Sequence, residues 1–154
     1  MQTTEFKAAI ADRQAAMKVL SYASREELAR GLEVLGGDHG AATLRGSETG
    51  LVMLRGRMGG AGDPFNLGEA TVTRATVRIA SGETGHSYAL GRDLEKARLS
   101  AVVDALWQRP EKQQAVEENI LAPVRMRLET EERVRREKVA ATRVDFFTMV
   151  RGDD

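Results

Sequence analysis

Apolar residues near the N-terminus recur at helical spacing. Phe6, Ile10, Met17 and Leu20 stand about four residues apart or at multiples of that spacing. Such a period places them on one side of an α-helix, so the segment is expected to pack one face against a core.

A second helix is predicted directly afterwards. Ser24 precedes Glu27 by three residues, which is the spacing of a capping box, and three leucines at helical spacing follow. A Gly-Gly pair at positions 36–37 is typical of a helix end. Two helices therefore precede the first strand.

The middle of the chain changes to a strand-like period. From residue 41 to residue 93, Gly, Thr, Val and Arg dominate, and apolar residues alternate with polar ones. The pattern predicts a mainly antiparallel sheet of about four strands, the third of them bent or broken. The expected strands cover residues 42–45, 51–57, 65–80 and 84–90.

Ser81 and Gly82 suggest a tight turn between the last two predicted strands. If they are the two loop residues of a hairpin, Val77 lies opposite His86 and Ala75 lies opposite Tyr88. One side of the pair, expected to face the core, then carries Ala75, Val77, Ile79, His86, Tyr88 and Leu90. Arg74 and Arg78 are expected on the other side.

The chain then returns to helical spacing. Asp93 is a plausible N-cap for an apolar stripe that runs to Trp107, and Pro110 should break that helix. A second long helix is expected from near Glu111 to about Val139, kinked or restarted at Pro123. The whole chain, residues 1–154, therefore reads as a single α+β domain with N-terminal helices, a sheet, and long C-terminal helices.

The last twelve residues form an unusually apolar tail. It places two of the four phenylalanines close to the end of the chain, where segments are usually polar unless something holds them. The tail is apolar at odd and even positions alike, which suits an extended segment covered on both sides, such as a strand added to a sheet edge. The candidate partner-binding residues are Phe146, Phe147, Met149, Val150 and Arg151, the last pairing with a carboxylate.

Composition narrows the class of function. The chain has 23 basic and 23 acidic residues and a formal net charge of zero, which argues against binding to nucleic acid or to a membrane surface. It contains no cysteine, which excludes disulfides, thiolate metal sites and cysteine nucleophiles. The N-terminal segment does not resemble a signal peptide and no apolar run approaches the length of a membrane span. A cytoplasmic protein is expected.

No catalytic arrangement is evident. The glycine-rich stretch at residues 55–69 lacks the spacing of a phosphate-binding loop, and the two histidines give no metal-ligand pattern. His86 and Ser87 are neighbours on a predicted strand and so point to opposite faces, which disfavours a nucleophile–base pair. No cofactor and no metal are expected. The remaining candidate for chemistry is an anion site on one sheet face, formed by Arg55, Arg57, Arg74 and Arg78 with His86 as a proton-transfer group.

The tail can be covered by this chain's own sheet or helices, or by a partner, and composition favours neither. In an oligomer such as a homodimer, the tail can be covered both by its own chain and by a partner. The absence of a recognisable active site favours an interaction protein over an enzyme.

Several strings in order along the chain, among them PFNLGE, GHSY, LGRD and VDFFTMVRG, resemble the PhnG subunit family of the bacterial carbon–phosphorus lyase system for phosphonate use. The resemblance implies an accessory, non-catalytic subunit of a core complex with PhnH, PhnI and PhnJ. It implies that this complex supports formation of ribose 1-methylphosphonate 5-triphosphate from ATP and methylphosphonate. PhnI is the family's usual candidate for that step, PhnJ later cleaves the carbon–phosphorus bond, and PhnG packs on PhnI. The family supplies no catalytic residue for this chain.

Overall fold

The computed structural model describes residues 2–141 and the side chains of residues 9–140. The chain begins with helices α1 (Gln2–Tyr22) and α2 (Arg25–Leu35) and continues with strands β1 (Ala42–Arg57), β2 (Pro64–Arg78) and β3 (Thr84–Leu90). Helices α3 (Leu94–Trp107), α4 (Pro110–Val116) and α5 (Ala122–Ala141) follow. The α+β fold expected from the sequence is confirmed.

The start and end of α2 follow the predicted signals. Ser24 Oγ accepts a hydrogen bond from the backbone N–H of Glu27 at 3.1 Å, and Glu27 Oε2 accepts one from the backbone N–H of Ser24 at 2.7 Å. Gly36 closes the helix in the left-handed region with φ of 102°, which glycine adopts without steric cost. The capping box and the glycine stop are both confirmed.

Within residues 2–141, the sheet has three strands in the order β1–β2–β3, all antiparallel. The first two strands expected from the sequence are one continuous strand, β1. The glycines at 46 and 50 suggest an interruption, but β2 is long enough to pair on both sides of it. Register shifts between Thr43 and Arg45 and between Arg45 and Glu48 absorb the irregular stretch.

The β2–β3 hairpin has a register one residue away from the expected one. Thr76 lies opposite His86 and Val77 lies opposite Gly85. The backbone N–H of Ile79 donates to the carbonyl of Glu83 at 3.1 Å, which leaves a three-residue loop at 80–82 in place of the expected two. The loop therefore contains one residue more than the sequence reading assumed.

A one-residue shift moves every side chain of a strand to the other face. The core side of the hairpin carries Ala75 and Val77 from β2 and Ile79 directly after it, as expected, but Gly85, Ser87 and Ala89 from β3. His86, Tyr88 and Leu90 lie instead on the outer face with Arg74 and Arg78. The expectation that these three residues face the core was wrong.

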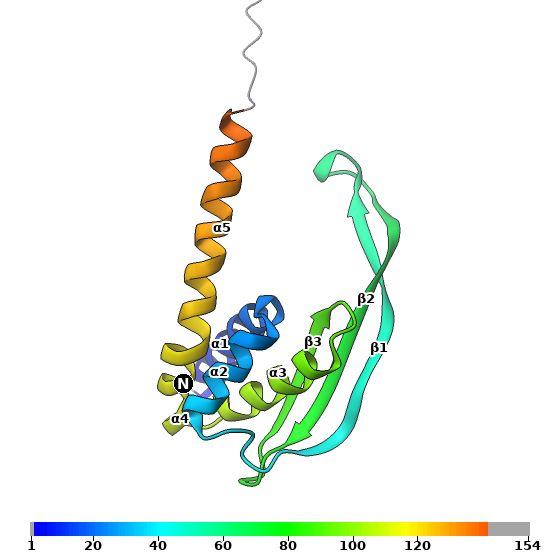
Figure 1. Ribbon diagram of the computed structural model, residues 1–154. Coiled ribbons are helices and arrows are strands. Elements are labelled where there is room, and N and C mark those ends of the chain that lie inside the picture. The colour runs from blue at the N-terminus through cyan, green and yellow to red at the C-terminus, as the bar shows by residue number, and fades with distance from the viewer. Residues whose placement is uncertain (1, 142–154) are drawn as a thin grey trace, which may run out of the picture.

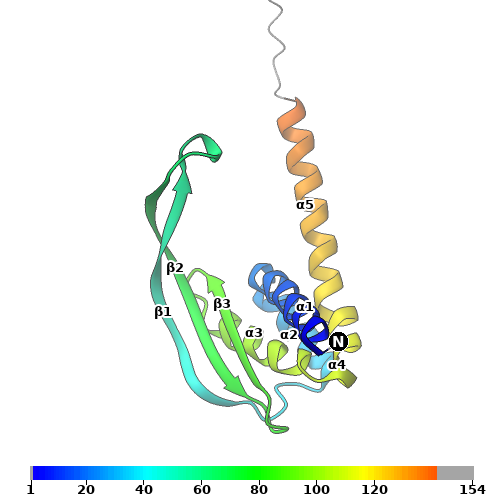
Figure 2. The ribbon, with the colours of Figure 1, turned by 180° about the vertical axis from the view of Figure 1, so that it is seen from behind.

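Helix α3 lies in the middle of the molecule (Figure 1). It packs on the core face of β2 and β3, while α1, α2 and α4 contact it from its other sides (Figure 2). It is buried almost all round, from Ala97 to Leu106 with one partly exposed position. Its surface carries alanine and valine where it meets the sheet and the neighbouring helices.

Gly85 lets α3 approach β3 closely. A Cβ atom at this position would stand 1.9 Å from the carbonyl oxygen of Ala101 and 2.6 Å from the backbone nitrogen of Ala105. Both obstacles are backbone atoms of a packed helix, which cannot move aside as a flexible side chain can. Glycine is therefore required at this position by the packing.

The C-terminal helices confirm both proline predictions. Helix α3 ends at Trp107, and Pro110 is the first residue of α4, where its missing N–H is not needed. A single wide π-helical stretch, Glu117–Leu121, joins α4 to α5, and Pro123 falls in the first turn of α5. The expected restart at Pro123 thus takes the form of a π-bulge directly before it.

We predict that Gly85→Ala lowers the free energy of unfolding by about 3 kcal/mol or more, because the added methyl group forces α3 away from β3. Urea unfolding followed by circular dichroism measures the change. Gly50→Ala in β1 is the matched control, since a Cβ there meets nothing within 4 Å. Equal stability of the two variants would contradict the close packing.

Candidate partner-binding surfaces

Two elements project from the packed body on the same side (Figure 1). One is the ribbon arm, formed by residues 51–57 of β1, residues 64–71 of β2 and the tip between them. The other is the helical arm, residues 129–141 of α5. Pairing of β3 with β2 stops where Leu90 lies opposite Val72, so within the described part of the chain the strands of the ribbon arm pair only with each other.

The ribbon arm exposes large apolar side chains on both faces. By alternation along β1, Leu51 and Met53 lie on the face that continues the core side, and Leu54 lies on the outer face. The Phe65 ring lies against Gly56, where a Cβ would stand 3.2 Å from a ring carbon. The side chains that are 41–70% exposed are Leu51, Met53, Leu54, Met58, Phe65 and Leu67.

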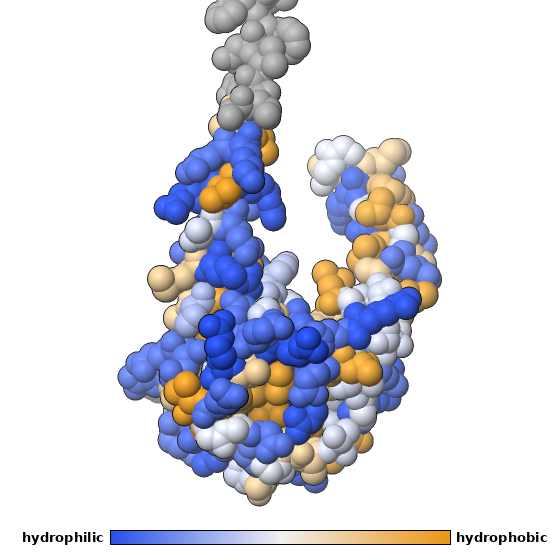
Figure 3. Space-filling model, viewed as in Figure 1, coloured by the Kyte–Doolittle hydropathy of each residue, from blue (hydrophilic) through white to orange (hydrophobic). Residues whose placement is uncertain are grey.

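Contiguous apolar surface of this kind on a projecting element marks an interaction site in most proteins. Orange side chains line the ribbon arm in the space-filling view, including positions that face the gap between the two arms (Figure 3). A ribbon of two strands is also marginally stable in water by itself. The ribbon arm is therefore the main candidate partner-binding surface in the described part of the chain.

The helical arm is mainly charged. Arg127 pairs with Glu131 at 2.8 Å and Arg136 pairs with Glu132 at 2.9 Å, each four residues apart. Ion pairs at this spacing are usual on a solvent-facing helix surface. Val134 and Val139 are exposed between these charges.

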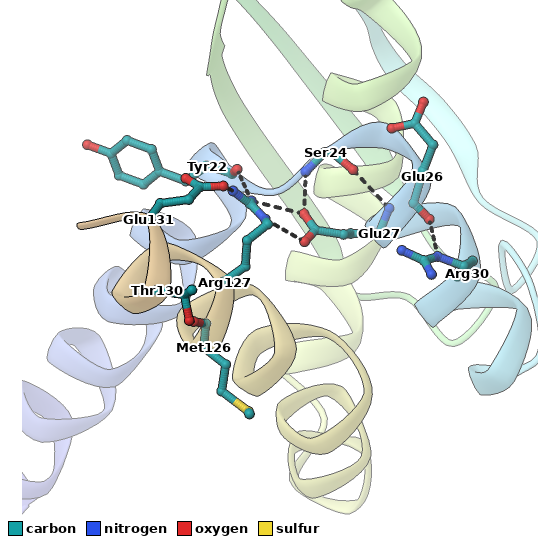
Figure 4. A network of polar contacts seen from close by, with 9 residues as sticks. All are labelled: Tyr22, Ser24, Glu26, Glu27, Arg30, Met126, Arg127, Thr130 and Glu131. Carbon is teal, nitrogen blue, oxygen red and sulfur yellow. Dashed lines mark hydrogen bonds and ion pairs between the residues drawn. The ribbon is translucent and has the colours of Figure 1, made fainter. Parts of the chain in front are cut away.

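Arg127 anchors the base of α5 to the N-terminal helices (Figure 4). Its guanidinium donates to Glu27 through Nε at 2.7 Å and through Nη2 at 3.0 Å, and Nη2 also donates to the carbonyl of Tyr22 at 2.9 Å. The hydrogen bonds from Arg127 lower the pKa of Glu27. Because Glu27 also caps α2, one carboxylate fixes both the start of α2 and the direction of α5.

Asp104 is a buried acid that joins three elements. It is 1% exposed. Its two oxygens accept hydrogen bonds from Arg13 Nε at 2.9 Å and Nη2 at 2.7 Å, and Oδ2 also accepts from the backbone N–H of His86 at 2.8 Å. The arrangement ties α1 and β3 to α3, and the hydrogen bond to Asp104 raises the pKa of Arg13. All of these contacts are structural.

Sequence reasoning did not identify Asp104 or Arg13. The available signal was an aspartate within an otherwise apolar stripe, between Val103 and Ala105. Such a charge is expected to have a partner, but its partner lies 91 residues away in the chain. Spacing along one helix does not reveal such a pair.

Three of the five candidate anion-binding residues share the outer sheet face. Arg74 Nε donates to Glu48 at 2.6 Å, which already counters its charge. Arg78 Nε contacts Thr84 Oγ1 at 3.4 Å, and His86 Nδ1 contacts Thr76 Oγ1 at 3.1 Å.

The other two candidates lie further along β1. Arg55 and Arg57 are on the side of that strand opposite Glu48, within the ribbon arm. Arg57 Nη1 donates to the carbonyl of Gly62 at 3.2 Å. The structure therefore does not gather the four arginines into one site.

A hollow of about 240 Å³ lies between α1 and the β3 strand. Met17, Leu20, His86, Tyr88 and Ser100 are among its lining residues. Its volume is below the range of roughly 300–1,000 Å³ that is usual for small-molecule sites. Among residues 9–140, no group of three or more histidine, aspartate or glutamate side chains is placed to hold a metal ion. No helix in the described range is long and apolar enough to cross a membrane.

The candidate tail residues Phe146, Phe147, Met149, Val150 and Arg151 lie outside the described residues. Their expected role in binding stays a prediction. The tail follows directly on α5, which the Arg127–Glu27 contact orients.

The model of the family described as phosphonate metabolism protein PhnG matches residues 11–152. The chain belongs to the PhnG family. The matched range includes the ribbon arm, both histidines and the apolar tail. The resemblance seen in the sequence is thereby confirmed over most of the chain.

A relative from Rhizobium meliloti (strain 1021) supports the same membership. It is the alpha-D-ribose 1-methylphosphonate 5-triphosphate synthase subunit PhnG, and it is 50% identical over 151 residues. The alignment covers 98% of this chain and 96% of the relative. Members of the PhnG family are thus matched here over nearly their full length.

We predict that Glu27→Gln lowers the free energy of unfolding by about 1–3 kcal/mol at pH 7, because glutamine keeps the cap but loses the charged hydrogen bonds to Arg127. The folded-state pKa of Glu27 is lowered, so its stabilising effect is complete above the unfolded pKa and is lost as pH falls through the folded value. The difference from the wild type should therefore shrink below about pH 4.

Urea unfolding at a series of pH values measures this difference. Glu131→Gln, which removes only the exposed pair with Arg127, serves as control and should change stability by about 0.5 kcal/mol or less. A deficit of Glu27→Gln that stays constant from pH 7 to pH 3 would show that the ion pair does not contribute.

Proposed function

We propose that this chain is an accessory, non-catalytic subunit of an alpha-D-ribose 1-methylphosphonate 5-triphosphate synthase in the carbon–phosphorus lyase system. It acts in the cytoplasm with the PhnI, PhnH and PhnJ subunits and supports formation of ribose 1-methylphosphonate 5-triphosphate from ATP and methylphosphonate. The observation that carries the proposal is the 50% identity, over nearly all of both chains, to a protein named as that subunit.

The shape of the molecule supports a role in assembly. The polar contacts that are buried or half-buried, at Asp104 and at Glu27, hold helices and strands together. Six of the exposed large apolar side chains lie together on the projecting ribbon arm. This distribution suits a subunit that is held rigid by its own core and binds its neighbours through projecting elements.

The tail supplies the proposed anchors. Phe146, Phe147, Met149 and Val150 would bury apolar surface in the assembled complex, and Arg151 would pair with a carboxylate beside them. Truncating a side chain that fills a pocket at the centre of an interface can cost about 2 kcal/mol or more of binding free energy.

We predict that the double variant Phe146→Ala and Phe147→Ala loses most of its co-purification with tagged PhnI from cells that express all four core subunits. Asp153→Ala with Asp154→Ala is the matched control in the same tail and should co-purify like the wild type. Unchanged yield of the phenylalanine variant would contradict the anchoring role. Failure of the wild-type chain itself to co-purify would overturn the proposed function.

A direct role in substrate binding is a second candidate, because Arg74, Arg78 and His86 share one sheet face. Calorimetric titration of ATP and of methylphosphonate into the isolated chain separates the two functions. An accessory subunit is expected to give no binding heat at millimolar ligand. Micromolar binding that Arg78→Ala abolishes would favour the direct role.

A further inference from the structure

Among residues 2–141, one edge of β2 has no neighbouring strand in the ribbon arm. The backbone N–H of Gly91 donates to the carbonyl of Thr71 at 2.9 Å, and this bond is where pairing on the β3 side ends. Gly91 then turns the chain away towards α3 with φ of 93°. From Thr71 back to Pro64, β2 pairs with β1 alone.

This edge is open to pairing. Natural sheets normally protect an edge strand, because its unpaired N–H and C=O groups accept another strand. Here only a bulge near Leu67 and the charge of Glu69 interrupt it. A third strand would convert a ribbon that is marginal in water into a sheet of the size that is normally stable.

The same chain has a segment that fits this edge. Residues 144–150, VDFFTMV, contain neither proline nor glycine and alternate in a way that places apolar side chains on both faces. The segment has seven residues, as has the open stretch of β2 from residue 64 to residue 70. The two faces of the ribbon arm are likewise both apolar, with Leu51 on one and Leu54 on the other.

The position of α5 favours the chain's own segment over that of a second copy. Figures 1 and 2 both show α5 ending on the side of the molecule to which the ribbon tip projects. Thirteen residues follow Ala141. Two of them, Thr142 and Arg143, link Ala141 to the segment, and these three steps along the chain span about 10 Å in extended form, at roughly 3.3 Å per residue.

We propose that residues 144–150 add to the free edge of β2 in the ribbon arm of the same chain, as a strand that continues the line of β3. The strand starts near the ribbon tip and runs towards the body, parallel to β2. Pairing through the backbone leaves the side chains of Phe146 and Phe147 on opposite faces, so the completed arm is apolar on both. The pairing itself does not depend on the proposed function, although the burial of this arm between other subunits does.

The absence of native cysteine permits a clean proximity test. The full-length double variant Asn66→Cys with Asp145→Cys is treated with a short bis-maleimide and examined on a denaturing gel and by mass spectrometry. Asn66 is an exposed residue of β2 near the tip, and neither substitution removes an apolar side chain. The control pair is Glu33→Cys with Asp145→Cys, since Glu33 is exposed on α2 in the body.

An intramolecular cross-link in the first pair, absent from the control, is the expected result. A covalent dimer would show that a second copy supplies the strand and would overturn the proposal. Equal or absent cross-linking in both pairs would overturn it as well. Each of these outcomes is independent of co-purification with PhnI.

Hydrogen exchange tests whether the contact is a backbone pairing. Thr148→Pro removes one N–H from the proposed strand, while Thr148→Ala keeps it. The proline variant of the full-length chain is expected to lose slow amide exchange over residues 64–71, and the alanine variant is expected to keep it. Equal exchange over these residues in the two variants would overturn strand addition.

Discussion

The close contact between α3 and β3 is the constraint on which the rest of the structure depends. Gly85 brings the strand against the backbone of the helix, and Asp104 on that helix accepts the N–H of His86. The same carboxylate holds Arg13 of α1. Together these contacts fix the register of β3, and so they decide which residues of the sheet face the core and which face outwards.

The length of β3 follows from the same contact and shapes the molecule. Because the chain turns from β3 into α3 directly after Leu90, the sheet has three strands only over its lower part. The upper parts of β1 and β2 extend beyond any cover by α3 as a ribbon with apolar faces. On the other side, Arg127 and Glu27 hold α5 in a direction that brings its last described turn to the same end of the molecule as the ribbon tip.

Local signals predicted much of this fold. The capping box at Ser24, the stop at Gly36 and the break at Pro110 each act within a few residues, and each is found where the sequence places it. The side of β2 that faces the core was also predicted, because Ala75 and Val77 alternate with arginines. These features need no knowledge of the tertiary structure.

Features that depend on distant contacts were not predictable in this way. Gly82 suits both a two-residue and a three-residue hairpin loop. Only the packing of Gly85 on α3 decides between the two loop lengths. The three-residue loop places His86 and Tyr88 on the outer face instead of the core face. The joining of two expected strands into β1 depends on the length of β2, and the Arg13–Asp104 pair joins segments far apart in the chain. Composition predicts that the apolar tail is a binding segment, but what it contacts depends on the three-dimensional arrangement.

The central claim is that the projecting ribbon is buried by assembly while the body is complete in itself. Methionine oxidation tests it directly, because Met53 and Met58 on the ribbon arm are 52% and 70% exposed. Mild peroxide treatment followed by mass spectrometry compares the isolated chain with the complex co-purified with the other core subunits. The account predicts that both methionines oxidise readily in the isolated chain and slowly in the complex, whereas equal rates in the two samples would contradict it.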